Sequence, residues 1–136
     1  MQDNKVFKEL ISFFEMALNV LVIHRYEETA RQICGMIREL NHHGEYAPSI
    51  EEAIRRLQEK KYDRILMTPQ LSEELIAVKA LKRVDKITPL HILYFFESDH
   101  KDKLKDLGVA GIHDTKDSEN LYQKLEKILQ STPKKA

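Results

Sequence analysis

The stretch Tyr62-Asp-Arg-Ile-Leu-Met-Thr-Pro69 contains the feature that decides the fold. Three consecutive apolar residues, Ile65 to Met67, lie between a polar turn and a proline. A strand that is covered on both faces has no polar side, so it shows an apolar run instead of an alternation. We therefore predict a central strand over residues 64–68 of a parallel sheet. Thr68, at the C-terminal end of this strand, then lies where ligands of open α/β sheets bind.

The composition is that of one ordinary globular domain. The chain has 136 residues, of which 42% are hydrophobic and 32% are charged. Lys+Arg and Asp+Glu number 22 each, and this zero net charge argues against a nucleic-acid-binding surface, which needs a basic excess. The single cysteine, Cys34, excludes an internal disulfide framework. Because we find no signal peptide and no apolar run of membrane length, we expect a cytoplasmic protein.

Strand-like apolar runs alternate with helix-like apolar stripes along the rest of the chain. Besides the central strand, we expect strands over residues 20–23, 45–47 (with 43 as an alternative start), 90–95 and 109–113. Helices are expected over residues 27–40, from 50 onward, over 71–84, after 98, and after 117 or 118. Regular alternation of this kind predicts a parallel sheet with helices on both faces, joined by right-handed crossovers.

Local signals predict where the helices begin and end. Ser49 and Glu52 have the spacing of a capping box, with serine at the cap and glutamate three residues later. Gly44 is the expected stop of the helix over 27–40, and Gly108 the expected stop of the short helix after Ser98. Helical periodicity predicts these inward-facing residues: Ala30, Ile33, Cys34, Ile37, Leu40, Ile50, Ala53, Ile54, Leu57, Leu75, Ile76, Val78, Leu81, Leu104, Leu107, Leu121, Leu125, Ile128 and Leu129.

An additional amphipathic helix is expected over residues 1–18, ahead of the main domain at 19–130 and a disordered tail at 131–136. Its apolar stripe recurs at spacings of three and four and includes Phe7, Leu10, Ile11 and Phe14. An uncovered stripe favours a homodimer contact or an interdomain contact. The alternative is that this helix packs back on its own domain.

The spacing of the segments resembles the receiver domain of two-component response regulators over about residues 19–130. The resemblance is carried by Asn19-Val-Leu-Val-Ile-His-Arg25, Ser49-Ile-Glu-Glu-Ala-Ile54, Tyr62-Asp-Arg-Ile-Leu-Met-Thr68, Thr88-Pro-Leu-His-Ile-Leu-Tyr94 and Gly108-Val-Ala-Gly-Ile-His-Asp-Thr-Lys116. It implies a flavodoxin-like three-layer α/β/α sandwich with strand order 2-1-3-4-5. It also implies a functional site at the C-terminal ends of the first and third strands.

The residues at that site depart from the family pattern. The acidic pair that holds Mg²⁺ in the family falls on His24 and Arg25, and the phospho-accepting aspartate falls on Thr68. Mg²⁺ prefers oxygen ligands, usually carboxylates. A guanidinium about 4 Å from the ion would be repelled by roughly 8 kcal/mol at an effective dielectric constant of about 20. The resemblance therefore implies a degenerate form, a pseudo-receiver without aspartyl phosphorylation.

Two further family positions are also changed. The switch serine or threonine at the end of the fourth strand falls on Tyr94. The lysine after the fifth strand falls on Thr115, and Lys116 comes one place later. Ile112 replaces the aromatic residue with which the family's switch is coupled. The family's switch is therefore expected to be locked or absent here.

The same sheet edge has two interpretations. His24, Arg25 and Lys116 together suit an anion site for phosphate, a nucleotide or a carboxylate. The alternative is that Arg25 forms an internal ion pair with Asp114 or a glutamate. No glycine-rich phosphate loop accompanies the cluster.

Other candidate residues have structural interpretations. None of the six histidines has a zinc-binding spacing, so we expect no metal or other cofactor, and His91 is expected to be a hydrogen-bonded core residue. The aromatic run Tyr94 to Phe96 either forms an exposed partner surface or, with at least two members, belongs to the core.

We therefore expect a non-catalytic signalling module that binds a protein partner or a further domain of a longer protein. An enzyme is not expected, because the sequence shows no nucleophile–base pair. The resemblance points to one interaction face, made of Lys101, Lys105, Ile112, Asn120 and Lys124. The alternative function is a small-anion or nucleotide sensor at the degenerate site.

Overall fold

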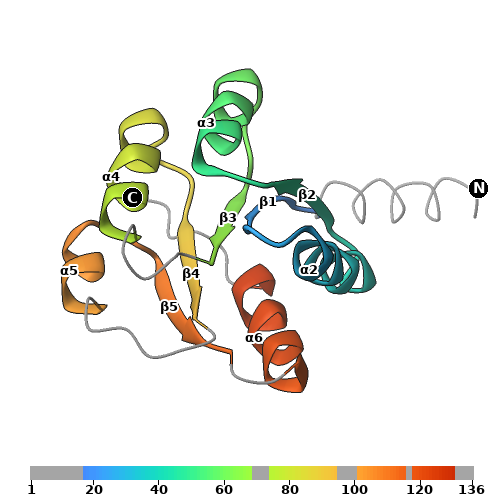
Figure 1. Cartoon of the computed structure of the whole chain (residues 1–136). Helices are drawn as coiled ribbons and strands as arrows, with labels where there is room; N and C mark the ends of the chain where they lie inside the picture. Colours follow the sequence, from blue (N-terminus) through green and yellow to red (C-terminus); the bar gives the residue numbers. More distant parts are fainter. Residues whose placement is uncertain (1–16, 69–73, 95–100, 116–117, 131–136) are drawn as a thin grey trace, which may run out of the picture.

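The chain folds as a five-stranded parallel sheet between two layers of helices (Figure 1). The computed structural model describes residues 17–68, 74–94, 101–115 and 118–130. The strands are β1 (Asn19–Ile23), β2 (His43–Ala47), β3 (Arg64–Met67), β4 (Leu90–Tyr94) and β5 (Gly111–Asp114). The helices are α2 (Glu27–Glu39), α3 (Ile50–Glu59), α4 (Glu74–Val84), α5 (Lys101–Asp106) and α6 (Ser118–Gln130). The strand order is β2-β1-β3-β4-β5, which confirms the predicted topology.

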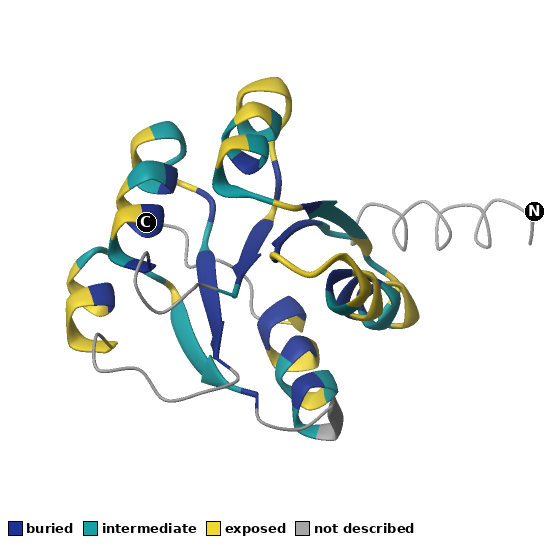
Figure 2. Ribbon diagram, viewed as in Figure 1, coloured by how far each residue is buried: buried dark blue, intermediate teal, exposed yellow. Residues whose placement is uncertain are grey.

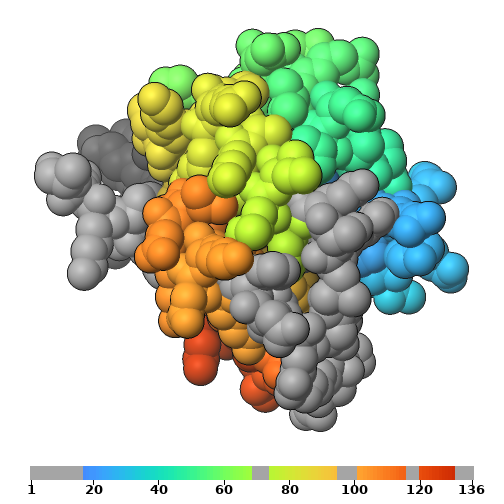
Figure 3. All heavy atoms as spheres, turned by 60° about the vertical axis from the view of Figure 1, so that its left-hand side comes forward, coloured from blue at the N-terminus to red at the C-terminus, as the bar shows by residue number. Residues whose placement is uncertain are grey.

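Each face of the sheet is covered by its own layer of helices. Helices α2 and α6 lie on one face, and α3, α4 and α5 lie on the other (Figure 1), with α4 between its two neighbours (Figure 3). The strands β1, β3 and β4 are buried on both faces (Figure 2). Burial on both faces explains why Ile65, Leu66 and Met67 are all apolar. Leu66 packs in the core beneath α2 and α6, whereas Ile65 and Met67 pack in the core on the opposite face of the sheet.

Most predicted inward-facing residues are buried or packed against the core, but the prediction for Ile76 is wrong. Its side chain is 70% exposed, whereas Glu74 and Ala77 are buried. The buried stripe of α4 runs through residues 74, 77, 78 and 81, which is the helical spacing i, i+3, i+4, i+7, and position 76 lies outside it. The predicted first residues of this helix, from 71, and Phe95 at the predicted end of β4 lie outside the described residues.

Helix α2 ends earlier than predicted, and its stop is Asn41 instead of Gly44. Asn41 adopts a left-handed conformation with φ of 68°. The backbone N–H of His42 donates to the Ile37 carbonyl and that of Asn41 to the Arg38 carbonyl, which is the Schellman pattern. Gly44 instead lies in β2, where an added Cβ would be 3.1 Å from the Cα of Cys34. This glycine therefore permits close packing of α2 on β2.

Strand β5 begins at Gly111, two residues later than predicted. Val109 belongs to the turn that ends α5, so it is not part of the strand. Gly108 has a left-handed φ of 85°, as expected of a helix stop. The Val109 N–H bonds back to the Leu104 carbonyl at 3.5 Å, and the Ala110 N–H donates to the Leu90 carbonyl at 2.8 Å. The chain therefore completes the helix cap before it joins β4.

A pair of histidines lies between β4 and β5. The Nδ1 atom of His91 is 3.1 Å from the Nε2 atom of His113, and the rings are stacked. Gly111 makes room for them, since an added Cβ would approach His113 Nε2 to 2.7 Å. His91 is buried, which confirms the predicted core role. Burial, and then the charges of His113 and Arg64, lower the pKa of His91 to about 4.

We expect the free energy of unfolding to fall as the pH drops from about 6.5 to about 4. In this window the unfolded chain binds a proton at position 91 that the folded chain excludes, a contribution of up to about 3 kcal/mol. Urea unfolding at several pH values measures it. The His91→Gln variant should show a smaller loss, whereas His43→Gln, at an exposed histidine of β2, should match the wild type. Equal pH dependence in all three proteins would contradict the assignment.

Candidate functional site

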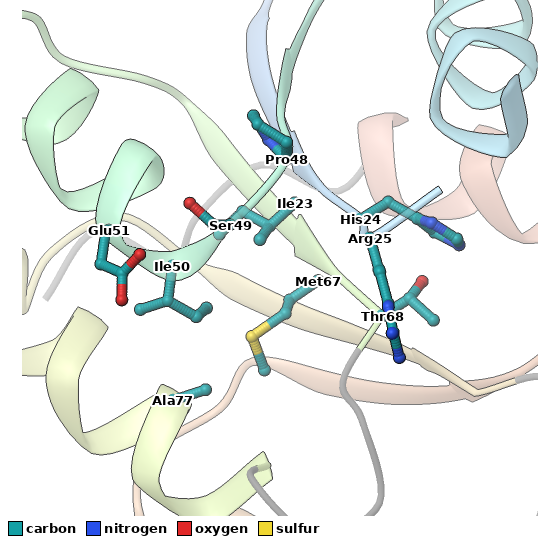
Figure 4. Close-up of a pocket in the computed structure, with 10 residues that line it drawn as sticks. All are labelled: Ile23, His24, Arg25, Pro48, Ser49, Ile50, Glu51, Met67, Thr68 and Ala77. Atoms are coloured by element: carbon teal, nitrogen blue, oxygen red, sulfur yellow. The ribbon is translucent and has the colours of Figure 1, made fainter. Parts of the chain in front are cut away.

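The carboxyl ends of β1 and β3 open onto a pocket of about 190 Å³ (Figure 4). Its walls come from the residues that follow β1, from the end of β3, from the first turn of α3 and from α4. Three of the residues predicted at the degenerate site, His24, Arg25 and Thr68, line this pocket together. The parallel pairing of β1 with β3 brings them together, because it places Ile23 beside Met67.

His24 is the first residue after β1 and lies in the wall of the pocket. Its side chain is only 5% exposed, and its Nδ1 atom accepts a hydrogen bond of 2.9 Å from the Tyr26 backbone N–H. Burial lowers the pKa of this imidazole, although the bond to Tyr26 acts in the opposite direction. The lowered pKa favours the neutral imidazole, and an anion site that includes His24 stays a prediction.

Arg25 supplies the positive charge of the pocket. It is exposed, and its guanidinium lies over the Tyr26 ring at 5.7 Å from the ring centroid. Within the described part of the chain it forms no ion pair, so the predicted alternative of a bridge to Asp114 is wrong. Its predicted companion, Lys116, lies outside the described residues.

Thr68 continues directly from the buried strand β3. Its backbone N–H donates to the Ile23 carbonyl at 3.1 Å, which fixes the backbone at the rim of the pocket. The side chain is half-buried, and in Figure 4 the Arg25 side chain extends to its side of the pocket. The position that carries the phospho-accepting aspartate in the family that this chain resembles therefore presents a hydroxyl to a pocket that Arg25 also lines.

The first turn of α3 forms the opposite wall, which the sequence reasoning did not assign to the site. Ser49 Oγ accepts a hydrogen bond of 3.1 Å from the Glu52 N–H, as the capping-box spacing predicted. Ile50 and Glu51 follow in this turn and line the pocket. The sequence could have predicted this wall. Helix α3 follows β2, which is parallel to β1, so its capped N-terminus lies at the same edge of the sheet as the end of β1.

Tyr94 is held in the interior at the carboxyl end of β4. Its hydroxyl donates a hydrogen bond of 2.7 Å to Glu74 Oε2, and both residues are 1% exposed. Thr115, which is fully buried, donates from its hydroxyl to the Tyr94 carbonyl at 3.0 Å. The structure thus places Tyr94 in the core, whereas Phe95 and Phe96 lie outside the described residues. The sequence did not indicate a role for Glu74, because glutamate side chains are usually exposed and the burial of this one could not be expected.

The described residues of the pocket do not fit the Mg²⁺ ion that the resemblance to receiver domains implies. Glu51 is the one carboxylate among them, Arg25 is a cation, and His24 Nδ1 already accepts a backbone N–H. Nowhere in residues 17–68, 74–94, 101–115 and 118–130 do three or more His, Cys, Asp or Glu side chains gather as a metal site would require. We therefore derive no step through a metal ion.

The predicted interaction residues lie on and beside β5. Lys101 and Lys105 are exposed on α5, whereas Ile112 of β5 and Lys124 of α6 are partly buried. Lys124 donates through Nζ to the Asp114 carbonyl, so its head group is fixed next to β5. Asn120 is also partly buried. The predicted stripe of Phe7, Leu10, Ile11 and Phe14 lies outside the described residues.

Comparison with known proteins shows which fold this is. No protein-family model and no curated protein sequence matches the chain. Among solved structures, the HemR receiver domain from Leptospira biflexa has a TM-score of 0.74 at 15% identity, covering 88% of this chain and 99% of that one. The chemotaxis response regulator CheY4 of Vibrio cholerae has a TM-score of 0.71 at 20% identity, covering 82% and 98%.

A third structure bears on the site. The receiver domain of the sensor histidine kinase PA1611 from Pseudomonas aeruginosa has a TM-score of 0.66 at 19% identity and covers 84% of this chain and 95% of its own. It is described with a magnesium ion coordinated in the active-site cleft. The chain therefore has the flavodoxin-like fold of response-regulator receiver domains, as the resemblance implied.

We expect the Tyr94→Phe variant to lower the free energy of unfolding by about 1–3 kcal/mol, because it removes the hydroxyl that donates to the buried Glu74 carboxyl. Chemical denaturation measures the change. Tyr26→Phe is the matched control, since Tyr26 is 62% exposed, and its effect should be below about 0.5 kcal/mol. Equally small effects at both positions would show that the buried hydrogen bond adds nothing to stability.

Proposed function

We propose that this chain is a non-catalytic signal-transduction module that acts through protein contacts without aspartyl phosphorylation. The observation that carries the proposal is the set of side chains at the carboxyl ends of β1 and β3. His24, Arg25 and Thr68 stand there, and none of them is a carboxylate. The receiver fold supports signalling as the general role, and we propose the cytoplasm as its location. No described helix is long and apolar enough to cross a membrane.

Elementary chemistry supports the absence of phosphoryl transfer. An acyl phosphate forms on a carboxylate, which Thr68 lacks, and a threonine hydroxyl needs a base to become a nucleophile. The histidine that lines the pocket, His24, uses its Nδ1 atom to accept the Tyr26 N–H. Charge stabilisation by a bound Mg²⁺ needs oxygen ligands that the described residues of the pocket do not supply.

The proposed partner surface rests on the resemblance to receiver domains and on the exposure of two lysine side chains. Lys101 and Lys105 present two exposed ammonium groups on α5, beside the partly buried Ile112 of β5. Asn120 and Lys124 extend this surface to α6. A cationic rim around a partly apolar strand suits an acidic protein surface. A further domain of a longer protein, or a second copy joined through residues 1–18, are the other partners that we propose.

The second candidate function is a small-anion or nucleotide sensor. The observation that favours it is the position of Arg25, an exposed guanidinium on the wall of a pocket, with no ion pair among the described residues.

We expect no covalent phosphoryl group on the chain after incubation with Mg²⁺ and phosphoramidate, measured by intact-mass spectrometry. The Thr68→Asp variant should also stay unmodified, because Arg25 and His24 still provide no Mg²⁺ ligand. A triple variant, His24→Asp with Arg25→Asp and Thr68→Asp, should bind Mg²⁺ more tightly than the wild type. A receiver domain with its own aspartate serves as the positive control. A phosphorylated wild-type chain would overturn the proposal.

We expect the double variant Lys101→Glu with Lys105→Glu to weaken binding of the physiological partner about tenfold or more, because it reverses two exposed charges on the proposed face. The unfolding midpoint should not change. Lys79→Glu, on the exposed side of α4, is the matched control and should bind normally. Isothermal titration with the partner compares the affinities, and equal values for the three proteins would exclude this face.

A further inference from the structure

The pocket at the carboxyl edge of the sheet has two ends of different charge. Arg25 and Thr68 line the same side of the pocket, as Figure 4 shows. At the other end stands Glu51, whose carboxylate forms no ion pair in the described part of the chain. Guanidinium and hydroxyl groups are donors that match a carboxylate, which accepts through two oxygens.

An apolar surface connects the two ends. Met67 lies between them in Figure 4, and Ile23, Ile50 and Ala77 also line the pocket. Apolar lining with a few polar groups at fixed positions is the usual construction of a small-molecule site. A bare inorganic anion would leave this apolar surface without a partner, whereas a ligand with a short hydrocarbon body would cover it.

The charge balance of the pocket argues against ligands with several negative charges. Arg25 contributes one positive charge and Glu51 one negative charge, and burial lowers the pKa of His24, which favours its neutral form. Glu51 and Glu52 also occupy the first turn of α3, where they already oppose the positive end of the helix dipole. Phosphate dianions and nucleotides would therefore meet no excess of positive charge among the described residues of the pocket.

The volume limits the size of the ligand. An apolar cavity of about 150 Å³ holds benzene, which has six non-hydrogen atoms. A pocket of about 190 Å³ therefore suits a molecule only slightly larger. A nucleotide is several times too large to be enclosed.

We propose that this pocket binds a small organic monocarboxylate with a short apolar chain, and that an amine at the far end of that chain increases the affinity. The carboxylate lies against Arg25 and Thr68, the chain lies along Met67 and Ala77, and the amine faces Glu51. The ligand class rests on the second candidate function, the anion sensor, and does not depend on the proposed protein contacts.

The test is a methyl NMR titration of the full chain, observing Met67, Thr68 and Ile50. The probes are 4-aminobutyrate, butyrate, 1-butanol and inorganic phosphate, all at one pH and ionic strength. We expect saturable shifts with 4-aminobutyrate and, at higher concentration, with butyrate. Butanol and phosphate should give weaker shifts or none, because butanol lacks the carboxylate and phosphate lacks the hydrocarbon chain.

Three variants connect the shifts to the proposed contacts. Arg25→Gln should weaken the binding of both carboxylates about tenfold or more, which corresponds to the loss of a charge-assisted hydrogen bond. Glu51→Gln should weaken the binding of 4-aminobutyrate but not that of butyrate. Arg31→Gln is the matched control, since Arg31 is an exposed arginine of α2 that pairs with Glu27, away from the pocket lining.

The outcomes separate the ligand class from the functions above. Phosphate binding that depends on Arg25, without carboxylate binding, would overturn the ligand class and leave the anion sensor standing. No saturable shift with any probe, or equal losses in Arg25→Gln and Arg31→Gln, would overturn both. Neither result would bear on the absence of aspartyl phosphorylation, which the phosphoramidate experiment tests.

Discussion

The burial of the parallel sheet on both faces is the constraint on which the rest of the structure depends. Because helices cover both faces, the side chains of β1, β3 and β4 are mostly apolar. Exposed polar groups therefore gather beyond the strand ends, where Arg25 and Thr68 line one pocket. The polar groups that do enter the interior have partners there, as the buried hydroxyl of Tyr94 has in Glu74.

The same constraint explains why the side chains at this edge can differ without a change of fold. The core forms from the strand interiors, so replacing residues at the strand ends leaves the packing intact. Arg25 is exposed, and Thr68 is tied to β1 through its backbone N–H and not through its side chain. A fold of this kind therefore retains a pocket at its carboxyl edge, whichever side chains line it.

The sequence was sufficient for the architecture and for most of the core, because apolar periodicity reports burial directly. It was insufficient where a residue other than glycine adopted the left-handed backbone conformation. Asn41 instead of Gly44 stops α2, since asparagine also tolerates the left-handed conformation and the glycine was needed for packing against Cys34. The resemblance placed His24, Arg25 and Thr68 together, but no periodicity predicts the lowered pKa of His24 or the burial of Glu74. Both depend on contacts between segments distant in the sequence.

We propose that Thr68 takes part in no phosphoryl chemistry, and one measurement can test this proposal. It is an amide NMR titration of the chain with Mg²⁺ and beryllofluoride, observing Thr68 and Tyr94, with beryllofluoride alone as the control. We predict no Mg²⁺-dependent saturable shift at either amide, because the described pocket offers no set of carboxylate ligands. Saturable shifts that require Mg²⁺ would contradict the claim and show that this edge still binds a phosphoryl group.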